Sequence, residues 1–207
     1  MLLFQYAIVG FFLSVLGSIP LGLITITNME RTVHRGTWSG IVVALGATVA
    51  EFLYTFIALK FLSYFLEQVQ ISQSINIFSV FVFLGLGIFY FFRTAGTSIS
   101  GKSPLMRHHY QDFFKGVIIG FMNMLIIPFW IFIGAMLETH NMYFASDRLI
   151  LVFSAGAALG ALAIFLLYVK LVKLIAKKIK QVVHYTNRVV GVLFFALTLF
   201  QLIRLLG

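Results

Sequence analysis

The sequence contains no cysteine among its 207 residues and has few charged ones. The lack of cysteine excludes disulfide frameworks, thiol catalysis, iron–sulfur clusters and cysteine zinc sites. Only 10% of the residues are charged, whereas 61% are hydrophobic. A water-soluble core cannot bury so much apolar surface, so we expect lipid to be the solvent of this chain.

The sequence motifs of common enzyme classes are absent as well. The chain has no HExxH motif, no Walker loop, no GxSxG motif and no dinucleotide-binding glycine pattern. Its five histidines fall between or beside the apolar runs, with no pair at i and i+4. We therefore predict that the protein is not an enzyme, has no catalytic residues and needs neither a metal nor another cofactor.

Six long apolar runs predict an all-α integral membrane protein. The runs are continuous rather than alternating, which favours helices over a barrel, and each is long enough to span the bilayer. The expected transmembrane helices cover residues 5–28, 38–62, 75–93, 115–137, 149–170 and 188–206. Together they use nearly the whole chain, so we expect residues 1–207 to form a single transmembrane domain.

The positive charges alternate between the connections. Most Lys and Arg residues fall in or beside the first, third and fifth connections, and the formal net charge is +9. Basic residues of membrane proteins collect in cytoplasmic loops facing anionic lipid. This predicts a multi-pass protein with both termini outside the cytoplasm. It also makes membrane lipids the expected partners of the basic charge and gives nucleic acid no role.

The two halves of the chain resemble each other weakly. Residues recur in the second half at offsets of 108 to 111: Pro20 with Pro128, Gly46-Ala47 with Gly156-Ala157, Lys60 with Lys170, and Arg93 with Arg204. Three helices per half would turn the second copy upside down. We therefore expect two inverted three-helix repeats, repeat A over about 1–100 and repeat B over about 110–207. The alternative is chance similarity between two halves rich in Phe and Leu.

Proline and glycine interrupt the first and fourth runs. Pro20 and Gly22 lie in the first run, and Asn123 and Pro128 disturb the fourth. Such breaks free backbone groups at membrane depth, and a matched pair of broken spans is typical of a transport site. The alternative is an ordinary proline kink that neighbouring helices satisfy.

Glu51 is the only acidic residue well inside an expected span. A charge there costs at least about 2.5–3.5 kcal/mol, so the carboxyl must be protonated, paired or facing a polar cavity. Spacings of three and four place it on one small, weakly polar helix face with Gly40, Ala44, Thr48 and Thr55. We predict that Glu51 couples transport to protons. The alternative is a structural carboxyl that stays neutral.

Other polar side chains complete the predicted substrate site. Ser14, Ser18, Thr25 and Asn28 form a polar stripe on the first run, although such groups serve helix packing equally well. The predicted substrate-binding residues are Ser18, Pro20, Gly22, Thr25, Asn28, Thr48, Asn123, Pro128 and Trp130. By contrast, Gly156 and Gly160 form a GxxxG step, which predicts close helix packing and is compatible with a homodimer.

The chain resembles the LysE/RhtB family of bacterial amino-acid exporters, which are small six-helix secondary carriers, over essentially its whole length. The likeness rests on Gly17–Gly22, Arg31–Gly40, Gly120–Pro128 and Asn187–Gly191. The family usually shows Pro-Gly in its first helix and Asn-Pro-Lys in its fourth. This chain has Pro20-Leu21-Gly22 and Ile127-Pro128-Phe129 instead, which identifies it as a divergent member.

The resemblance implies a secondary active transporter that exports amino acids or similar small solutes across a bacterial inner membrane. The pattern around Glu51 adds coupling to a proton gradient. A carrier of another small solute or cation from the same superfamily is one alternative. Another is a membrane scaffold or lipid-interacting protein that transports nothing and in which Glu51 is structural.

Overall fold

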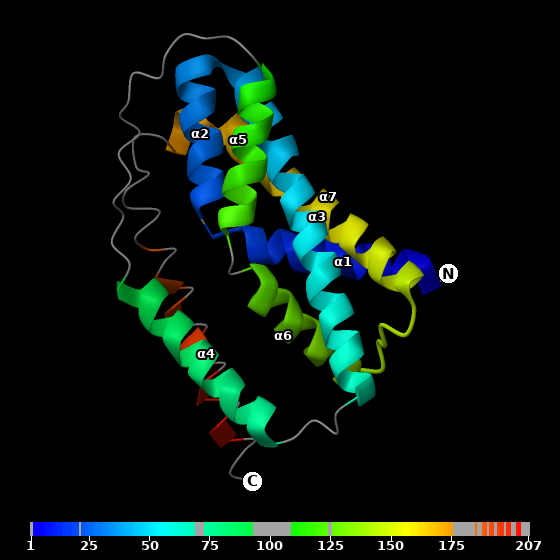
Figure 1. The fold of residues 1–207 in the computed structure, drawn as a ribbon. Coiled ribbons are helices and arrows are strands. Elements are labelled where there is room, and N and C mark those ends of the chain that lie inside the picture. Colours follow the sequence, from blue (N-terminus) through cyan, green and yellow to red (C-terminus); the bar gives the residue numbers. More distant parts are fainter. Residues whose placement is uncertain are drawn as a thin grey trace. The chain divides into compact units, whose positions relative to one another are not determined.

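A computed structural model of the chain is α-helical over the residues that it describes. These are residues 2–20, 22–68, 73–92, 109–123, 126–175, 185, 188, 189, 191, 192, 194–196, 198, 199, 202 and 203. Its seven labelled helices are α1 (Leu2–Ser18), α2 (Leu23–Arg35), α3 (Thr37–Gln68), α4 (Gln73–Phe92), α5 (His109–Met122), α6 (Ile126–Thr139) and α7 (Asp147–Ile175), as Figure 1 shows.

Two of these helices are long and apolar enough to cross a membrane on their own. They are α3 over Thr37–Tyr64 and α7 over Asp147–Val172. The pairs α1–α2 and α5–α6 each have the length and apolar character of one span that is bent, by 74° and 61° respectively. The described part of the chain therefore holds two to four candidate spans. The predicted helix at 188–206 lies partly outside the described residues.

Both bends fall in runs that were predicted to be interrupted. The first run is not one helix over 5–28, because α1 ends at Ser18 and α2 begins at Leu23, with Pro20 between them. The fourth run divides around Asn123. Pro128 does not mark this second break, contrary to prediction. It is the third residue of α6, where its missing N–H removes no hydrogen bond from the helix.

The chain divides by its internal contacts into two compact units. The first unit comprises Met1–Phe65 and Ile99–Lys177, and the second comprises Leu66–Ser98 and Lys178–Gly207. Within the second unit, the Phe83 and Phe194 rings stack with their centroids 6.2 Å apart. Gly87 lies so close to Phe195 that an added Cβ would be 2.8 Å from that ring. Aromatic rings therefore hold α4 against the described residues around 195.

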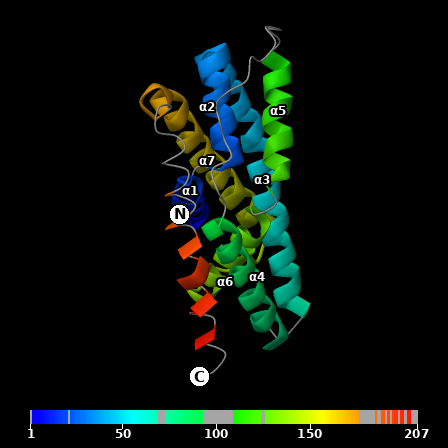
Figure 2. The ribbon, with the colours of Figure 1, turned by 90° about the vertical axis from the view of Figure 1, so that its left-hand side faces the viewer.

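The first unit contains every predicted site residue. Figure 1 shows α2 and α5 side by side at one end of it and α6 toward the other, and Figure 2 shows the same helices from the side. One cluster in its core consists of apolar side chains from α2, α3, α5 and α7: Ile24, Ala44, Ala47, Ile119, Ala161 and Phe165. Four helices therefore meet in one apolar layer.

Glycine makes the crossing of α1 with α7 close. A Cβ on Gly156 would lie 2.1 Å from the carbonyl oxygen of Ala7, and one on Gly10 would lie 2.4 Å from that of Phe153. Only the absence of a side chain permits backbones to approach so closely. The predicted packing role of the GxxxG step is thus confirmed, and its partner within the chain is α1.

A second crossing, of α3 with α5, uses glycine in the same way. A Cβ on Gly46 would lie 2.1 Å from the carbonyl oxygen of Phe113, and one on Gly116 would lie 2.1 Å from that of Val43. Gly120 continues the contact, since its added Cβ would lie 2.6 Å from the Cβ of Ala50. The two longest helices are therefore each bound to the first half of a bent pair.

Gly36 is the only residue between α2 and α3. Its φ of 94° is a conformation that residues with a side chain rarely adopt, and its N–H donates to the Thr32 carbonyl to end α2. Glycine here allows the chain to reverse within one residue. As a result, α2 runs back alongside the first turns of α3.

Candidate functional site

The side chain of Glu51 lies inside the first unit. It is 6% exposed, and its Oε1 accepts a hydrogen bond of 3.0 Å from Nε1 of Trp130, which is fully buried. The carboxyl thus has a polar partner from α6, the second helix of the bent pair α5–α6. No sequence spacing connects residues 51 and 130, so we did not predict this pairing and expected Trp130 only to line a pocket.

The helix face around Glu51 points inward, as its pattern predicts. Ala44 and Thr55 are fully buried, Gly40 is buried and Thr48 is half-buried. The Thr48 hydroxyl donates to the Ala44 carbonyl at 2.8 Å, and the Thr55 hydroxyl donates to the Glu51 carbonyl at 2.7 Å. Both hydroxyl hydrogens are therefore engaged by the helix itself, and the hydroxyl oxygens keep their capacity to accept a hydrogen bond.

Aromatic rings pack around the Trp130 indole, the partner of Glu51. Trp130 meets Phe129 and Phe153 edge to face, with centroids 5.0 and 5.5 Å apart. Phe153 in turn meets Phe144, which meets Tyr6, at 5.2 and 5.6 Å. Rings packed in this way exclude water and fix the direction of the indole N–H. These rings form an aromatic enclosure for the indole that donates to Glu51.

The break between α1 and α2 lies close to this enclosure. Ser18 and Pro20 are half-buried, and Gly22 precedes α2 without any side-chain cap on its first N–H groups. One turn earlier, an added Cβ on Gly17 would lie 2.7 Å from the ring of Phe129. The structure therefore brings the first break against the aromatic residue next to Trp130.

A tyrosine stabilises each break. The Tyr168 hydroxyl on α7 donates to the Ile19 carbonyl at 2.5 Å, and the Tyr54 hydroxyl on α3 donates to the Phe121 carbonyl at 2.5 Å. Carbonyls at the end of a helix lack the next turn's N–H groups. Each phenol thus satisfies an oxygen that the break leaves free. Asn123, in the second break, is half-buried and holds the turn through its backbone.

Thr25 and Asn28 lie on α2 and not on one stripe with Ser14 and Ser18. The 74° bend separates the two pairs, so the predicted continuous stripe is wrong. Asn28 is fully buried, and among the described residues neither its amide nitrogen nor its amide oxygen has a hydrogen-bond partner. A buried amide without a partner is costly, so this position is suited to meeting a polar group that arrives from elsewhere.

An ionic cluster connects α2 with α5. Asp112 is fully buried and accepts a hydrogen bond of 2.9 Å from Arg35, while a guanidinium nitrogen of Arg31 lies 3.6 Å from the same oxygen. The sequence alone places Arg31 and Arg35 in or beside a basic connection and gives them no acidic partner. The pairing with Asp112 spans 77 residues and left no local signal.

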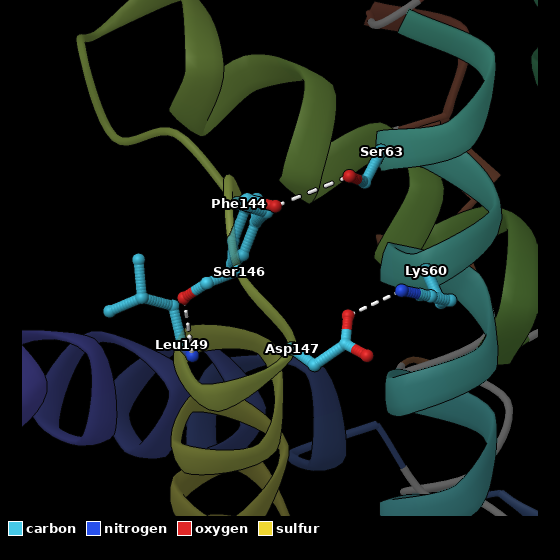
Figure 3. Close-up of polar contacts among 6 residues, drawn as sticks. All are labelled: Lys60, Ser63, Phe144, Ser146, Asp147 and Leu149. Carbon is cyan, nitrogen blue, oxygen red and sulfur yellow. Dashed lines mark hydrogen bonds and ion pairs between the residues drawn. The ribbon is translucent and has the colours of Figure 1, made fainter. Parts of the chain in front are cut away.

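A second ion pair lies at the far end of α3, as Figure 3 shows. Lys60 pairs with Asp147, and the Ser63 hydroxyl donates to the Phe144 carbonyl at 3.2 Å. Both charged side chains are more than half exposed. The Leu149 N–H donates to the Ser146 hydroxyl, which caps the start of α7. This exposed pair contrasts with the buried cluster at Asp112.

Comparison with known proteins extends the structural result. No curated protein matches the chain, and no solved structure matches it. The model of one protein family, described as LysE type translocator, matches residues 15–204. The match includes both breaks, the whole α5–α6 pair and both ion pairs, and it begins near the end of α1. The chain therefore belongs to the LysE type translocator family, whose members are transporters that carry small molecules across membranes.

Proposed function

We propose that this protein exports amino acids or similar small solutes across a bacterial inner membrane and that Glu51 couples export to the proton gradient. The proposal depends on one observation. Glu51 is a buried carboxyl within a candidate span, and it accepts a hydrogen bond from the indole N–H of Trp130, whose ring packs against Phe129 and Phe153. In such surroundings a carboxyl favours the neutral form, and solute or a conformational change can alter that preference.

The breaks next to Glu51 supply groups for binding the solute. Uncapped N–H groups follow Gly22, and Ser18, Thr25, Thr48, Asn28 and Asn123 add hydroxyl and amide groups. The partial positive charge of a helix N-terminus suits a carboxylate. Pro20 and Pro128 stiffen the chain at and just after the breaks, and Trp130 closes the apolar side. An amino acid has the mixture of charged ends and small size that such a site suits.

The two glycine crossings support an inverted repeat. Their contacts correspond when α1 is compared with α5 at an offset of 106 residues and α3 with α7 at an offset of 110: Ala7 with Phe113, Gly10 with Gly116, Val43 with Phe153, and Gly46 with Gly156. The tyrosine contacts at the breaks also recur in both halves. Each crossing joins a helix of repeat A to one of repeat B. We infer that alternating access moves these two pairs relative to each other.

The proposed topology follows from the placement of charge. Six spans with the basic first, third and fifth connections in the cytoplasm leave both termini outside. Arg31, Arg35 and Asp112 then lie toward the cytoplasmic end of the site, and Lys60 with Asp147 toward the opposite end.

Transport in liposomes tests the function. The purified protein should take up a labelled amino acid against its gradient when a pH gradient is imposed, and amino acids that compete identify the substrate. Glu51→Gln should abolish uphill transport but retain exchange of solute across equal pH, because an amide cannot carry the proton.

Two outcomes would contradict the proposal. Unchanged proton dependence in the Glu51→Gln variant would show a structural carboxyl. Absence of any solute flux, with folded protein in the vesicles, would favour the membrane scaffold. Thr48→Val is the matched control for the same helix face. It removes a hydroxyl but leaves the carboxyl, so it should alter solute affinity rather than proton dependence.

A further inference from the structure

The buried cluster at Asp112 occupies the end of the first unit where α2 ends and α5 begins. Arg31 and Arg35 contribute from the last two turns of α2, and their side chains are only 15% and 10% exposed. Asp112 contributes from the first turn of α5. Lys60, the start of the opposite ion pair, lies 23 residues beyond Thr37 on α3, or roughly 35 Å along the helix. The cluster at Asp112 and the Lys60–Asp147 pair therefore lie at opposite ends of the first unit.

One face of α2 connects this cluster with the interior. Ile24, Asn28, Arg31 and Arg35 follow each other at spacings of four, three and four, so they share that face. Ile24 belongs to the apolar cluster that includes Ile119 of α5, and Arg35 pairs with Asp112 of the same helix. Asn28 thus lies between two points at which α2 contacts α5, behind the ionic cluster.

A buried ion pair of this kind adds little to stability. The cost of removing charges from water offsets most of their attraction, and apolar residues of similar volume often stabilise a fold as well or better. One oxygen of Asp112 also lacks a hydrogen-bond partner among the described residues. The cluster therefore suits a contact that opens and closes better than one that only supports the fold.

We propose that Asp112, held by Arg31 and Arg35, is the latch of a cytoplasmic gate whose opening exposes the Asn28 amide to solute. The inference rests on the proposed transport function and assigns the control of access to one residue outside the Glu51 enclosure. With the latch closed, α2 and α5 are joined and Asn28 has no access to solvent. When Asp112 releases the arginines, the two half-helices separate at their cytoplasmic ends.

The native chain has no cysteine, so a single introduced cysteine reports the gate directly. Asn28→Cys is placed in the native chain and in the Asp112→Asn variant, and inside-out membrane vesicles are treated with an impermeant maleimide. Labelling should be slow with Asp112 and at least about tenfold faster in Asp112→Asn, because the neutral amide holds the arginines less tightly. Right-side-out vesicles should label slowly in both backgrounds.

Control variants separate a latch from a general loosening of the protein. Asp112→Glu keeps the charge and should keep labelling slow. Asp147→Asn removes the exposed pair at the opposite end and should not accelerate labelling from the cytoplasmic side. Arg35→Gln should also accelerate labelling, and it leaves Asp112 its contact with Arg31. This variant tests the latch if Asp112→Asn assembles poorly.

Equal labelling rates in the Asp112 and Asp112→Asn backgrounds would overturn the latch. Equal acceleration by Asp147→Asn would do so as well, because it would show that any lost ion pair loosens the bundle. The assay measures access and not flux. If liposomes show no transport but Asp112→Asn still opens the path to residue 28, the proposed function fails and the gate stands. If liposomes show normal transport but Asp112→Asn leaves the labelling of residue 28 unchanged, the gate fails and the proposed function stands.

Discussion

At the scale of single residues, the central feature is a carboxyl and an indole that meet from distant parts of the chain. A hydrogen bond to a charged acceptor contributes about 1.5–3 kcal/mol, more than a neutral one. The Trp130 N–H therefore distinguishes the ionised form of Glu51 from the neutral form. A change in this one contact accompanies any step in which the carboxyl gains or loses its proton.

Trp130→Phe should slow proton-driven transport about tenfold or more while the protein still assembles. Phenylalanine keeps the aromatic packing but cannot donate a hydrogen bond, so the ionised carboxyl loses its partner. Initial rates in liposomes under an imposed pH gradient provide the measurement. Trp38, the other tryptophan of the chain, is 59% exposed, and Trp38→Phe is the matched control. Equal losses in both variants would argue against a specific role for the indole.

Trp38→Phe also isolates Trp130 as the sole tryptophan. Its emission should be that of a buried indole, since Trp130 is fully buried among aromatic rings. Lowering the pH, or adding a transported solute, should shift this emission, and Glu51→Gln should remove the pH-dependent part. If the emission spectrum of the Trp38→Phe variant with Glu51 intact does not change with pH, Trp130 has no role in proton coupling.

At the scale of helices, glycine decides which elements lie together. Gly46 and Gly156 each face a carbonyl oxygen of the partner helix at a distance that excludes any side chain. Close backbone contact of this kind provides the van der Waals attraction that joins helices in lipid, where the hydrophobic effect between helices is lost. The crossings therefore leave no room for a side chain between the helices that they join.

Gly156→Ala and Gly46→Ala should each destabilise the protein by at least about 1–3 kcal/mol, because the new methyl group overlaps a backbone oxygen that cannot turn away. Gly85 lies on α4 with nothing within 4 Å of an added Cβ, so Gly85→Ala should be neutral or stabilise its helix. Thermal unfolding in detergent compares the three variants. Equal melting temperatures for all of them would refute the close crossings.

The tyrosines at the breaks predict a milder, paired effect. Tyr54→Phe and Tyr168→Phe each remove a single hydrogen bond to a free carbonyl, which is worth about 0.5–2 kcal/mol within a membrane. Both variants should lower turnover more than solute affinity, because the carbonyl at each break loses the tyrosine that holds it in place. Tyr64→Phe on α3 is the control, since its ring is 59% exposed. Matching losses in the control would remove the special role of the breaks.

The sequence predicted local features of the helices well and their partners poorly. The spacing around Glu51 was enough to identify its inward face, and Pro20 with Gly22 identified the first break. Pro128 did not identify the position of the second break, because proline is tolerated in the first turn of a helix as readily as in a break. The contacts Glu51–Trp130 and Arg35–Asp112 join residues 79 and 77 positions apart. Such pairs depend on how whole helices cross, which no local pattern encodes.

At the scale of the whole molecule, the orientation in the membrane can be tested on described positions. His34, near the end of α2, and Ala145, in the connection before α7, are both exposed. Single cysteines there should label from opposite sides. An impermeant reagent applied to intact cells should reach Ala145→Cys and not His34→Cys, because the proposed topology places the basic end of α2 in the cytoplasm. Labelling with the reverse pattern would invert the proposed topology and the direction assigned to the gate.

The crossing of α1 with α7 joins two parts of the chain that are synthesised at different times. Ala7 and Gly10 are made well before their respective partners, Gly156 and Phe153. At ordinary rates of synthesis this delay is on the order of ten seconds. Trp130 is likewise synthesised after Glu51. The Glu51 carboxyl therefore lacks its indole partner until then. The contacts that join the two halves of the chain can therefore form only after Trp130, Phe153 and Gly156 have been synthesised.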